Sequence, residues 1–247
     1  MWPRPKAPPI EQKPTLPLPY TGFNRERIQG LLDLAATGDQ ASLRGEHGLA
    51  AVIDPDTGDS VVHRAAAVGN VSFMRGIMDT FGKQISQNPA RERLYWVLIV
   101  HQNLAGDTAL HAAARTGNLR GAKAVYRLFH LDELDVDDET RGPDSEEPPA
   151  EDWDWSPAEM EDNPYQTVPS LSFVCTKNRA GRDAAAEARA AGHHDLAEWF
   201  DRLAQRLDRA GMRGDEDYMR QARQIALENH CYYDEVDNEK EQRKEDV

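Results

Sequence analysis

The stretch Gly106-Asp107-Thr108-Ala109-Leu110-His111-Ala112-Ala113-Ala114-Arg115-Thr116-Gly117-Asn118 indicates the fold of this chain of 247 residues. It aligns without gaps on residues 58–70, GDSVVHRAAAVGN, and more weakly on residues 181–193, GRDAAAEARAAGH. The third copy keeps both glycines and lacks the histidine. Self-similarity of this kind predicts a protein built from stacked structural repeats.

Each copy carries the start and stop signals of a helix. The first glycine stands where a tight turn favours a positive φ, and a Ser or Thr two residues later in the first two copies can cap the helix through its hydroxyl. The second glycine stands where the helix must end, which favours a left-handed cap. These framework positions are Gly58, Gly69, Gly106, Thr108, Gly117, Gly181 and Gly192.

A second helix is expected after each copy, because apolar residues recur there at helical spacing. The first of them shows the pattern at Val71, Met74, Ile77 and Met78. One helix pair cannot cover such an apolar face by itself, so neighbouring pairs must stack and share one elongated core.

The segment Thr108-Ala109-Leu110-His111-Ala112-Ala113 resembles the T-P-L-H-x-A signature of the ankyrin family, with alanine in place of proline, and residues 60–65 resemble it loosely. A degenerate opening unit is indicated at residues 31–39. The resemblance implies an all-α fold: a short ankyrin-repeat solenoid of about four helix-turn-helix units with insertions and C-terminal capping helices. It also implies that His63 and His111 are structural, with their ring nitrogens bonded within the turns.

The spacing of the copies departs from this family. Gly58 and Gly106 are 48 residues apart, and Gly106 and Gly181 are 75 apart, whereas the ankyrin unit is about 33 residues long. The first insertion contains Asn88 and Pro89, which favour a helix start and an extended outer helix pair. In stacked repeats, insertions form loops on one face, often the binding face.

We therefore expect five parts in the chain. They are a proline-rich disordered arm (residues 1–23), an ankyrin-repeat domain (24–209), an acidic disordered insertion within that domain (132–164), a C-terminal helix (210–232) and an acidic tail (233–247).

The second insertion holds the charge of the molecule. Residues 132–162 contain 15 of the 43 Asp and Glu residues and one basic residue, Arg141, which equals the entire net charge of −14. One interpretation is a solvated loop that maintains solubility. The other is a partner-binding segment, in which Trp153 and Trp155 are aromatic anchors on a cationic surface beside Glu151, Asp152 and Asp154.

Composition and motifs argue against several other classes. A pI near 5.0 disfavours direct nucleic-acid binding, and no apolar run approaches the length of a membrane span. His193-His194 lacks neighbours at metal-ligand spacing, and there is no phosphate-binding glycine loop or G-x-S-x-G motif. We expect no enzymatic activity, no cofactor and no metal site.

Two functions remain open. The first is an acidic escort or chaperone of a basic protein, since residues 178–188 resemble the last repeat of a small acidic fungal ankyrin chaperone of a small-subunit ribosomal protein. The second is a regulatory adaptor in a transcription or signalling complex that binds through the concave repeat face, because residues 106–115 also resemble repeats of such regulators. Both predict a protein partner and a chain that is monomeric alone. We also expect a cytoplasmic or nuclear location, because the chain has only two cysteines and nothing in the sequence fixes a disulfide between them.

Overall fold

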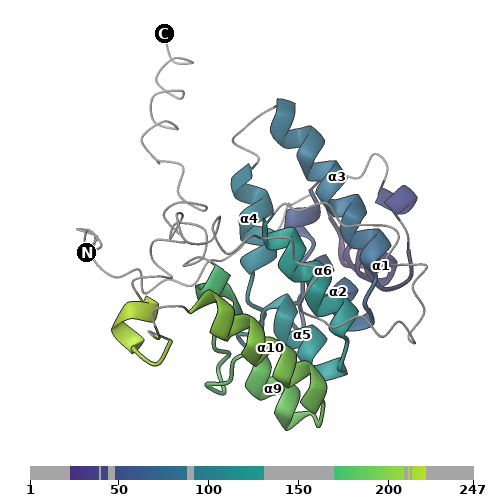
Figure 1. Cartoon of the computed structure of the whole chain (residues 1–247). Helices are drawn as coiled ribbons and strands as arrows, with labels where there is room; N and C mark the ends of the chain where they lie inside the picture. Colours follow the sequence, from purple (N-terminus) through teal and green to yellow (C-terminus); the bar gives the residue numbers. More distant parts are fainter. Residues whose placement is uncertain are drawn as a thin grey trace, which may run out of the picture.

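The computed structural model describes residues 23–38, 40–43, 48–87, 92–130, 170–208, 211 and 213–220. Most of them are helical (Figure 1). The α-helices are α1 (Arg25–Thr37), α2 (Val61–Val68), α3 (Val71–Gln87), α4 (Glu92–Val100), α5 (Ala109–Thr116), α6 (Leu119–His130), α9 (Ala184–Ala190) and α10 (His194–Leu207), and the short 3-10 helices are η1 (Gln40–Leu43) and η2 (Leu49–Ala51). Within these ranges, extended pairing is limited to one isolated antiparallel bridge between Ile53 and Ser60.

The helices pack in two rows. Helix α2 contacts α1 on one side and α5 on the other, and α5 in turn contacts α9, which gives an inner row. Helices α3, α6 and α10 form the outer row, in which each packs against the inner helix that precedes it, α2, α5 or α9. Helix α6 also contacts α2 and α3. In Figure 1 the inner helices follow one another across the molecule from α1 through α2 and α5 to α9. The described part is therefore a stack of helix pairs.

Alanines and one glycine allow this close stacking. The side chains of Ala65 and Ala66 in α2 and of Ala113 in α5 are fully buried between inner helices. Gly121 of α6 faces the backbone of α2, where a Cβ atom would overlap the carbonyl oxygen of Ala66. Because glycine lacks that atom, the two helices approach to backbone contact.

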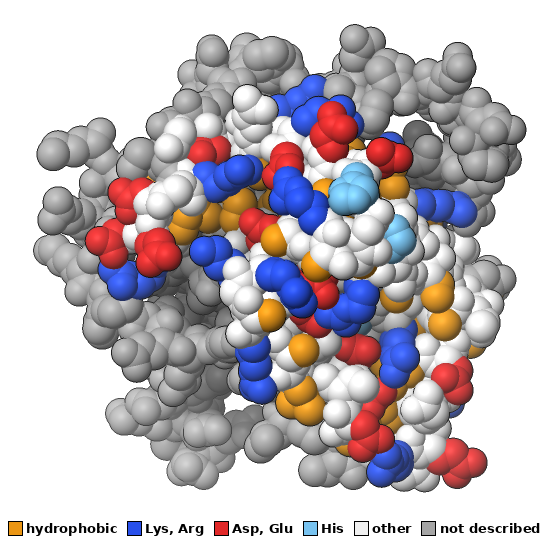
Figure 2. Space-filling view, turned by 90° about the horizontal axis from the view of Figure 1, so that it is seen from below, with side chains coloured by type: hydrophobic (Ala, Val, Ile, Leu, Met, Phe, Trp, Pro, Cys, Tyr) orange, Lys and Arg blue, Asp and Glu red, His pale blue; other side chains and the backbone are white. Residues whose placement is uncertain are grey.

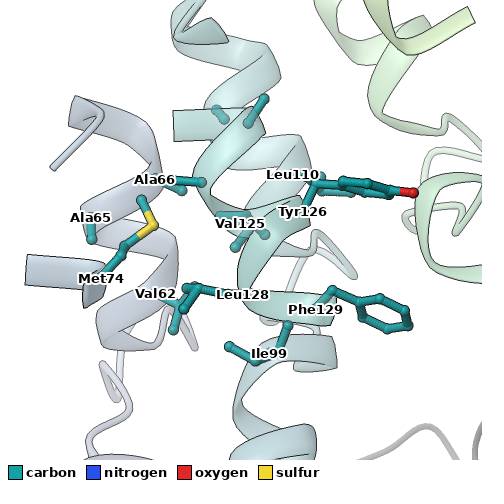
Figure 3. Packing of buried hydrophobic residues seen from close by; sticks show 14 of the residues in the cluster. Val62, Ala65, Ala66, Met74, Ile99, Leu110, Val125, Tyr126, Leu128 and Phe129 are labelled. Carbon is teal, nitrogen blue, oxygen red and sulfur yellow. The ribbon is translucent and has the colours of Figure 1, made fainter. Parts of the chain in front are cut away.

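Larger apolar side chains fill the space between the rows (Figure 3). Met74 of α3 and Val62 of α2 point toward Val125 and Leu128 of α6, and Leu110 of α5 lies beside Tyr126. Each of these side chains is at most 4% exposed. The same core continues from Ile28 in α1 to Leu207 in α10, so one elongated core spans all the helix pairs.

The first insertion adds a helix to the outer row. Helix α3 extends over 17 residues, and α4 packs against α3, α6 and η2. Buried aromatic rings connect them: Phe81 meets Tyr95 edge-on at 5.5 Å, and Trp96 meets Phe129 edge-on at 5.4 Å between ring centroids. The expected start at Asn88 and Pro89 lies outside the described residues.

The opening unit differs from a helix pair. Helix α1 occupies the inner position, but the chain that follows contributes the 3-10 helices η1 and η2, with η1 against α3. The cap also differs, because Gly38 has φ −81° instead of a left-handed conformation. The side chain of Asn70 compensates by donating hydrogen bonds to the carbonyl oxygens of Ala35 and Gly38.

Several expected segments lie outside the described residues. These are most of the N-terminal arm, the acidic insertion and the acidic tail. Of the expected C-terminal helix, residues 216–220 are helical and residues 221–232 are outside the described ranges. Among the described helices, none combines the length and apolar character needed to cross a bilayer.

Candidate protein-binding surface

Three equivalent turns precede α2, α5 and α9. Gly58, Gly106 and Gly181 have φ values of 77°, 78° and 74°, as their sequence positions predict. In the second and third turns an asparagine organises the backbone: the side-chain oxygen of Asn103, and likewise that of Asn178, accepts hydrogen bonds from the N–H groups two and four residues further on, at 2.9 to 3.1 Å. The two turns are therefore closed by the same bonds.

The first turn uses an aspartate instead. Asp54 Oδ1 accepts hydrogen bonds from the N–H groups of Asp56 and Thr57 at 2.9 and 3.4 Å, and Asp54 Oδ2 accepts one from Arg64 at 2.7 Å. Burial alone would raise the pKa of Asp54, but the bonds from Asp56, Arg64 and Thr57 outweigh it and hold the pKa below its usual value. This carboxylate is charged at neutral pH and closes the turn.

Hydrogen bonds join each turn to the next. The N–H of Leu104 donates to the carbonyl of Thr57 at 3.0 Å, and the N–H of Arg179 donates to the carbonyl of Ala105 at 2.9 Å. The contact is close, because a Cβ atom on Gly58 would lie 2.7 Å from the nitrogen of Leu104. The three turns thus form one row with a fixed spacing.

Side chains make a second set of links between turns. Asn103 donates through Nδ2 to Asp59 Oδ1 at 2.8 Å, and Asn178 donates through Nδ2 to Asp107 Oδ1 at 2.8 Å. The same bond therefore recurs at the same position, and it links the second turn to the first and the third turn to the second.

The two signature histidines serve the turns. His63 Nδ1 lies 2.9 Å from the hydroxyl of Ser60, and His63 Nε2 donates to the carbonyl of Asp107 at 2.9 Å. His111 repeats this with Thr108 at 2.9 Å and the carbonyl of Arg182 at 3.0 Å. Because a carbonyl only accepts, Nε2 carries the proton in both rings.

Burial keeps both rings neutral. Desolvation, together with the nearby His101, lowers the pKa of His63 to about 4, and desolvation also lowers the pKa of His111. A neutral ring can accept at Nδ1 and donate at Nε2 at once, as the turns require. Neither ring is placed to bind a metal, and within the described residues no three His, Cys, Asp or Glu side chains are grouped to hold one.

One member of this network was not predicted by the sequence analysis. His101, in the insertion after α4, donates from Nε2 to the carbonyl of Gly58 at 2.8 Å, and its ring lies edge-on to His63 at 5.6 Å. Its Nδ1 is buried without a hydrogen-bond partner. His101 stands outside the aligned copies, so self-similarity could not identify it.

Ion pairs line the inner helices between the second and third turns. Arg115 of α5 bonds Asp107 at 2.5 Å and Glu187 of α9 at 3.2 Å, and Arg182 bonds the same Glu187 at 2.8 Å. Asp107 and Glu187 are 1% and 5% exposed. Burial would raise the pKa of Asp107, but Arg115 and Asn178 outweigh it and lower that pKa. The carboxylates are thus buried beneath arginines.

The other framework residues end the inner helices. Gly69 and Gly117 both have φ 71°, and Gly192 has φ 85°, as expected for left-handed caps. After the third of these ends His193 is the N-cap residue of α10, and its Nε2 lies 3.2 Å from the carbonyl oxygen of Arg115. His194 is exposed.

The tips of the turns are exposed and chemically different from one another. Two residues before the turn glycine stand Asp56, Leu104 and Arg179, all exposed. Leu104 is 54% exposed, one of two large apolar side chains exposed in the described part of the chain. Figure 2 views the molecule from below Figure 1 and shows Lys and Arg side chains over the middle of that face, with Asp and Glu among them and apolar atoms in small patches.

The structure does not test the expected partner-binding residues. Glu151, Asp152, Trp153, Asp154 and Trp155 all lie outside the described residues. The residues that the structure does describe include 18 Lys and Arg and 17 Asp and Glu. The packed helices are therefore nearly neutral, and the excess negative charge belongs to the rest of the chain.

These observations define a helical protein of stacked helix pairs with a rigid row of exposed turns. No protein-family model matches the chain, and no curated protein does. Among solved structures, the chain is similar to one in the crystal structure of the yeast ribosomal protein Rps3 in complex with its chaperone Yar1, with 18% sequence identity and a TM-score of 0.46 over 73% of this chain and 94% of that one.

Proposed function

We propose that this chain is a non-catalytic ankyrin-type protein that escorts a basic protein client. The observation that carries the proposal is the separation of charge. The described helical stack has 18 basic and 17 acidic residues, while residues 132–162 alone hold a charge of −14. A near-neutral scaffold that carries one concentrated acidic segment is suited to binding a cationic surface.

The framework supports the ankyrin assignment. The signature residues Thr108 and His111 form one turn network, and Ser60 and His63 form the same network one unit earlier. Gly58, Gly106 and Gly181 occupy equivalent turns in a single row. We propose on this basis that the stacked pairs are degenerate ankyrin repeats, with α1 as the remnant of an opening repeat.

The position of the acidic segment fits an escort. It joins α6 to the helical residues at 170–174, so it is inserted between the second and third turn-bearing units. When the segment binds a basic client, its carboxylates would form ion pairs with the Lys and Arg side chains that otherwise attract the phosphate groups of nucleic acids. Trp153 and Trp155 would add apolar or cation–π contact within the same segment.

The experiment removes charge without changing length. In one variant every Asp and Glu of residues 132–162 becomes Asn or Gln, and Trp153 and Trp155 are kept. A second variant, Trp153→Ala with Trp155→Ala, keeps the charge. Binding of a fluorescent lysine-rich peptide is measured by anisotropy at several salt concentrations. We expect the neutral variant to lose about tenfold or more in affinity and most of its salt dependence.

Several outcomes would contradict the escort function. Unchanged affinity and salt dependence in the neutral variant would show that the segment is only a solvated loop. Loss of affinity in the tryptophan variant alone, with no effect of charge, would indicate apolar recognition. The thermal unfolding midpoint of each variant serves as the control, because none of the changed residues belongs to the described helices and we expect their stability to be unchanged.

A regulatory adaptor is the second candidate, favoured by the exposed turn tips. Leu104 projects from a turn held by backbone bonds on both sides, as expected for a fixed recognition surface rather than a solubilising one. An adaptor that binds through the inner face should keep its partner at high salt. Affinity capture at low and high salt, followed by mass spectrometry, separates the two candidates.

The free thiol of Cys175 bears on the cellular location of the protein. Cys175 is a free thiol, and burial raises its pKa to about 11, so it stays protonated and poorly nucleophilic at neutral pH. We propose the cytosol or the nucleus as its compartment. Imaging of a fluorescent fusion would test this, and a signal confined to a secretory compartment would contradict it.

A further inference from the structure

The row of turn tips has an order of charge along it. Counting back two residues from the turn glycine gives Asp56 in the first turn, Leu104 in the second and Arg179 in the third. Four residues before the glycine stand Asp54, Gln102 and Lys177, of which Asp54 is buried and bonded to Arg64 and Lys177 is exposed beside the basic tip. The tips therefore change from acidic through apolar to basic, although the net charge of the packed helices is close to zero.

These three side chains are accessible. Leu104 is 54% exposed, the side chain of Asp56 is 67% exposed, and Arg179 is exposed. Asp56 pairs with Arg25, whose side chain is 72% exposed. Exposed ion pairs contribute little to stability, so a partner can replace Arg25 at little cost.

The row is rigid, which gives the order a fixed length. The backbone bonds from Leu104 to Thr57 and from Arg179 to Ala105 hold the tips at equivalent positions. Packed helices lie about 8 to 10 Å apart, so two steps span about 20 Å. An extended chain covers that distance with about six residues.

We infer that the turn tips Asp56, Leu104 and Arg179 form a docking strip for an extended protein segment of about seven residues with a basic end, an apolar middle and an acidic end. The basic end of the segment lies at the first turn and its acidic end at the third. Leu104 contacts the apolar residue between them. This inference goes beyond the proposed function, because none of these residues belongs to the acidic segment at 132–162.

The test uses peptides that differ only in order. One fluorescent peptide, Lys-Lys-Ser-Leu-Ser-Glu-Glu, separates its charges, and a second, Lys-Glu-Ser-Leu-Ser-Glu-Lys, has the same composition and net charge. Both peptides are neutral overall, and both are also measured on the variant with residues 132–162 neutralised, because adjacent lysines could favour the acidic segment. We expect the separated peptide to bind about fivefold or more tightly, Asp56→Asn with Arg179→Gln to abolish the preference, and Leu104→Ser to weaken both peptides alike. Equal affinities would overturn the inference.

Orientation gives an independent readout. A spin label on the basic end of the peptide should broaden the amide signals of Asp56 and Thr57 in the intact protein. In the variant Asp56→Arg with Arg179→Asp, the broadening should move to residues 178–180, because the peptide reverses. The matched control is Glu198→Arg with Arg202→Glu, which exchanges an exposed pair on α10 and should leave the broadening at the first turn.

Two results of the labelling would overturn the docking strip. Broadening that stays at the first turn in the charge-exchanged variant would show that charge order does not orient the peptide. Broadening confined to residues 132–162 would place the peptide on the acidic segment, which agrees with the proposed escort function and refutes the strip. Failure of the strip and failure of the escort function are thus separate results.

Discussion

Three buried histidines lie beside the turns, and each has one ring nitrogen hydrogen-bonded to a carbonyl. His63 and His111 donate to the turn that follows, and His101 donates to the turn that precedes. Burial lowers the pKa of all three rings. Each ring is therefore neutral in the folded protein over a pH range in which it would be charged in the unfolded chain.

This linkage predicts a loss of stability in mild acid. An unfolded histidine has a pKa near 6.5, and that of His63 is about 4 in the folded protein. Between these values the unfolded chain binds more protons, so the free energy of unfolding falls as pH falls from about 6.5 toward 4. Full stability is present above that range. By pH 4 the lowered pKa of His63 alone reduces the free energy of unfolding by on the order of 3 kcal/mol. Asp54 and Asp107, with lowered pKa values, add a further loss only at lower pH.

Urea unfolding at a series of pH values measures this effect. The midpoint should fall clearly between pH 7 and pH 5, and the control His194→Gln, which changes an exposed ring, should show the same fall. A midpoint that stays constant over this range would mean that the buried rings are charged or solvated.

Two glycines in helices provide an opposed pair of predictions. In Gly121→Ala the new methyl group meets the carbonyl of Ala66, so the gain in helix propensity is outweighed and the protein loses about 1 to 3 kcal/mol. In Gly82→Ala, on the exposed side of α3, a Cβ meets no described atom within 4 Å, and stability should rise by about 0.5 to 1 kcal/mol. Chemical denaturation measures both, and a stabilised Gly121→Ala variant would refute the close packing of α6 on α2.

At the scale of elements, the inserted helix α4 is joined to α6 by more than apolar contact. The hydroxyl of Tyr95 donates to the carbonyl of Leu128 at 2.6 Å. Leu128 stands in the last turn of α6, where carbonyls lack partners within the helix. The insertion therefore caps the end of α6, the outer helix of the unit that follows it in the chain.

Tyr95→Phe tests this cap. The ring keeps its packing, but the buried carbonyl of Leu128 loses its donor, so the free energy of unfolding should drop by about 1 to 3 kcal/mol. The half-buried Tyr218 offers a control, and Tyr218→Phe should change stability by less than about 0.5 kcal/mol. Equal effects of the two substitutions would show that the Tyr95 hydroxyl has no special role.

At the scale of the whole molecule, local signals predicted the periodic part of the fold. The positive φ angles at Gly58 and Gly106 and the left-handed caps at Gly69 and Gly117 follow from chemistry within a few residues. For the same reason the sequence placed the inner helices and the outer helix that follows each.

Contacts between distant residues were not predictable in this way. The bonds of Arg115 to Glu187, 72 residues later in the chain, and of His101 to Gly58 depend on how the units stack. The opening unit has η1 in place of an outer α-helix. This difference could not be predicted, because the weak similarity of that unit to the other copies set no clear boundary. The candidate partner residues of the acidic segment stay a prediction, and the docking strip became visible only once the three turns could be superimposed.

Competition between this chain and RNA for a basic peptide tests whether the acidic segment at 132–162 shields a cationic client from nucleic acid. A labelled lysine- and arginine-rich peptide is first bound to single-stranded RNA, and the chain is then added at low and at physiological salt. We expect the wild-type chain to remove the peptide from the RNA and the variant with residues 132–162 neutralised to leave it bound. Equal removal by both, or no removal by the wild-type chain, would contradict it.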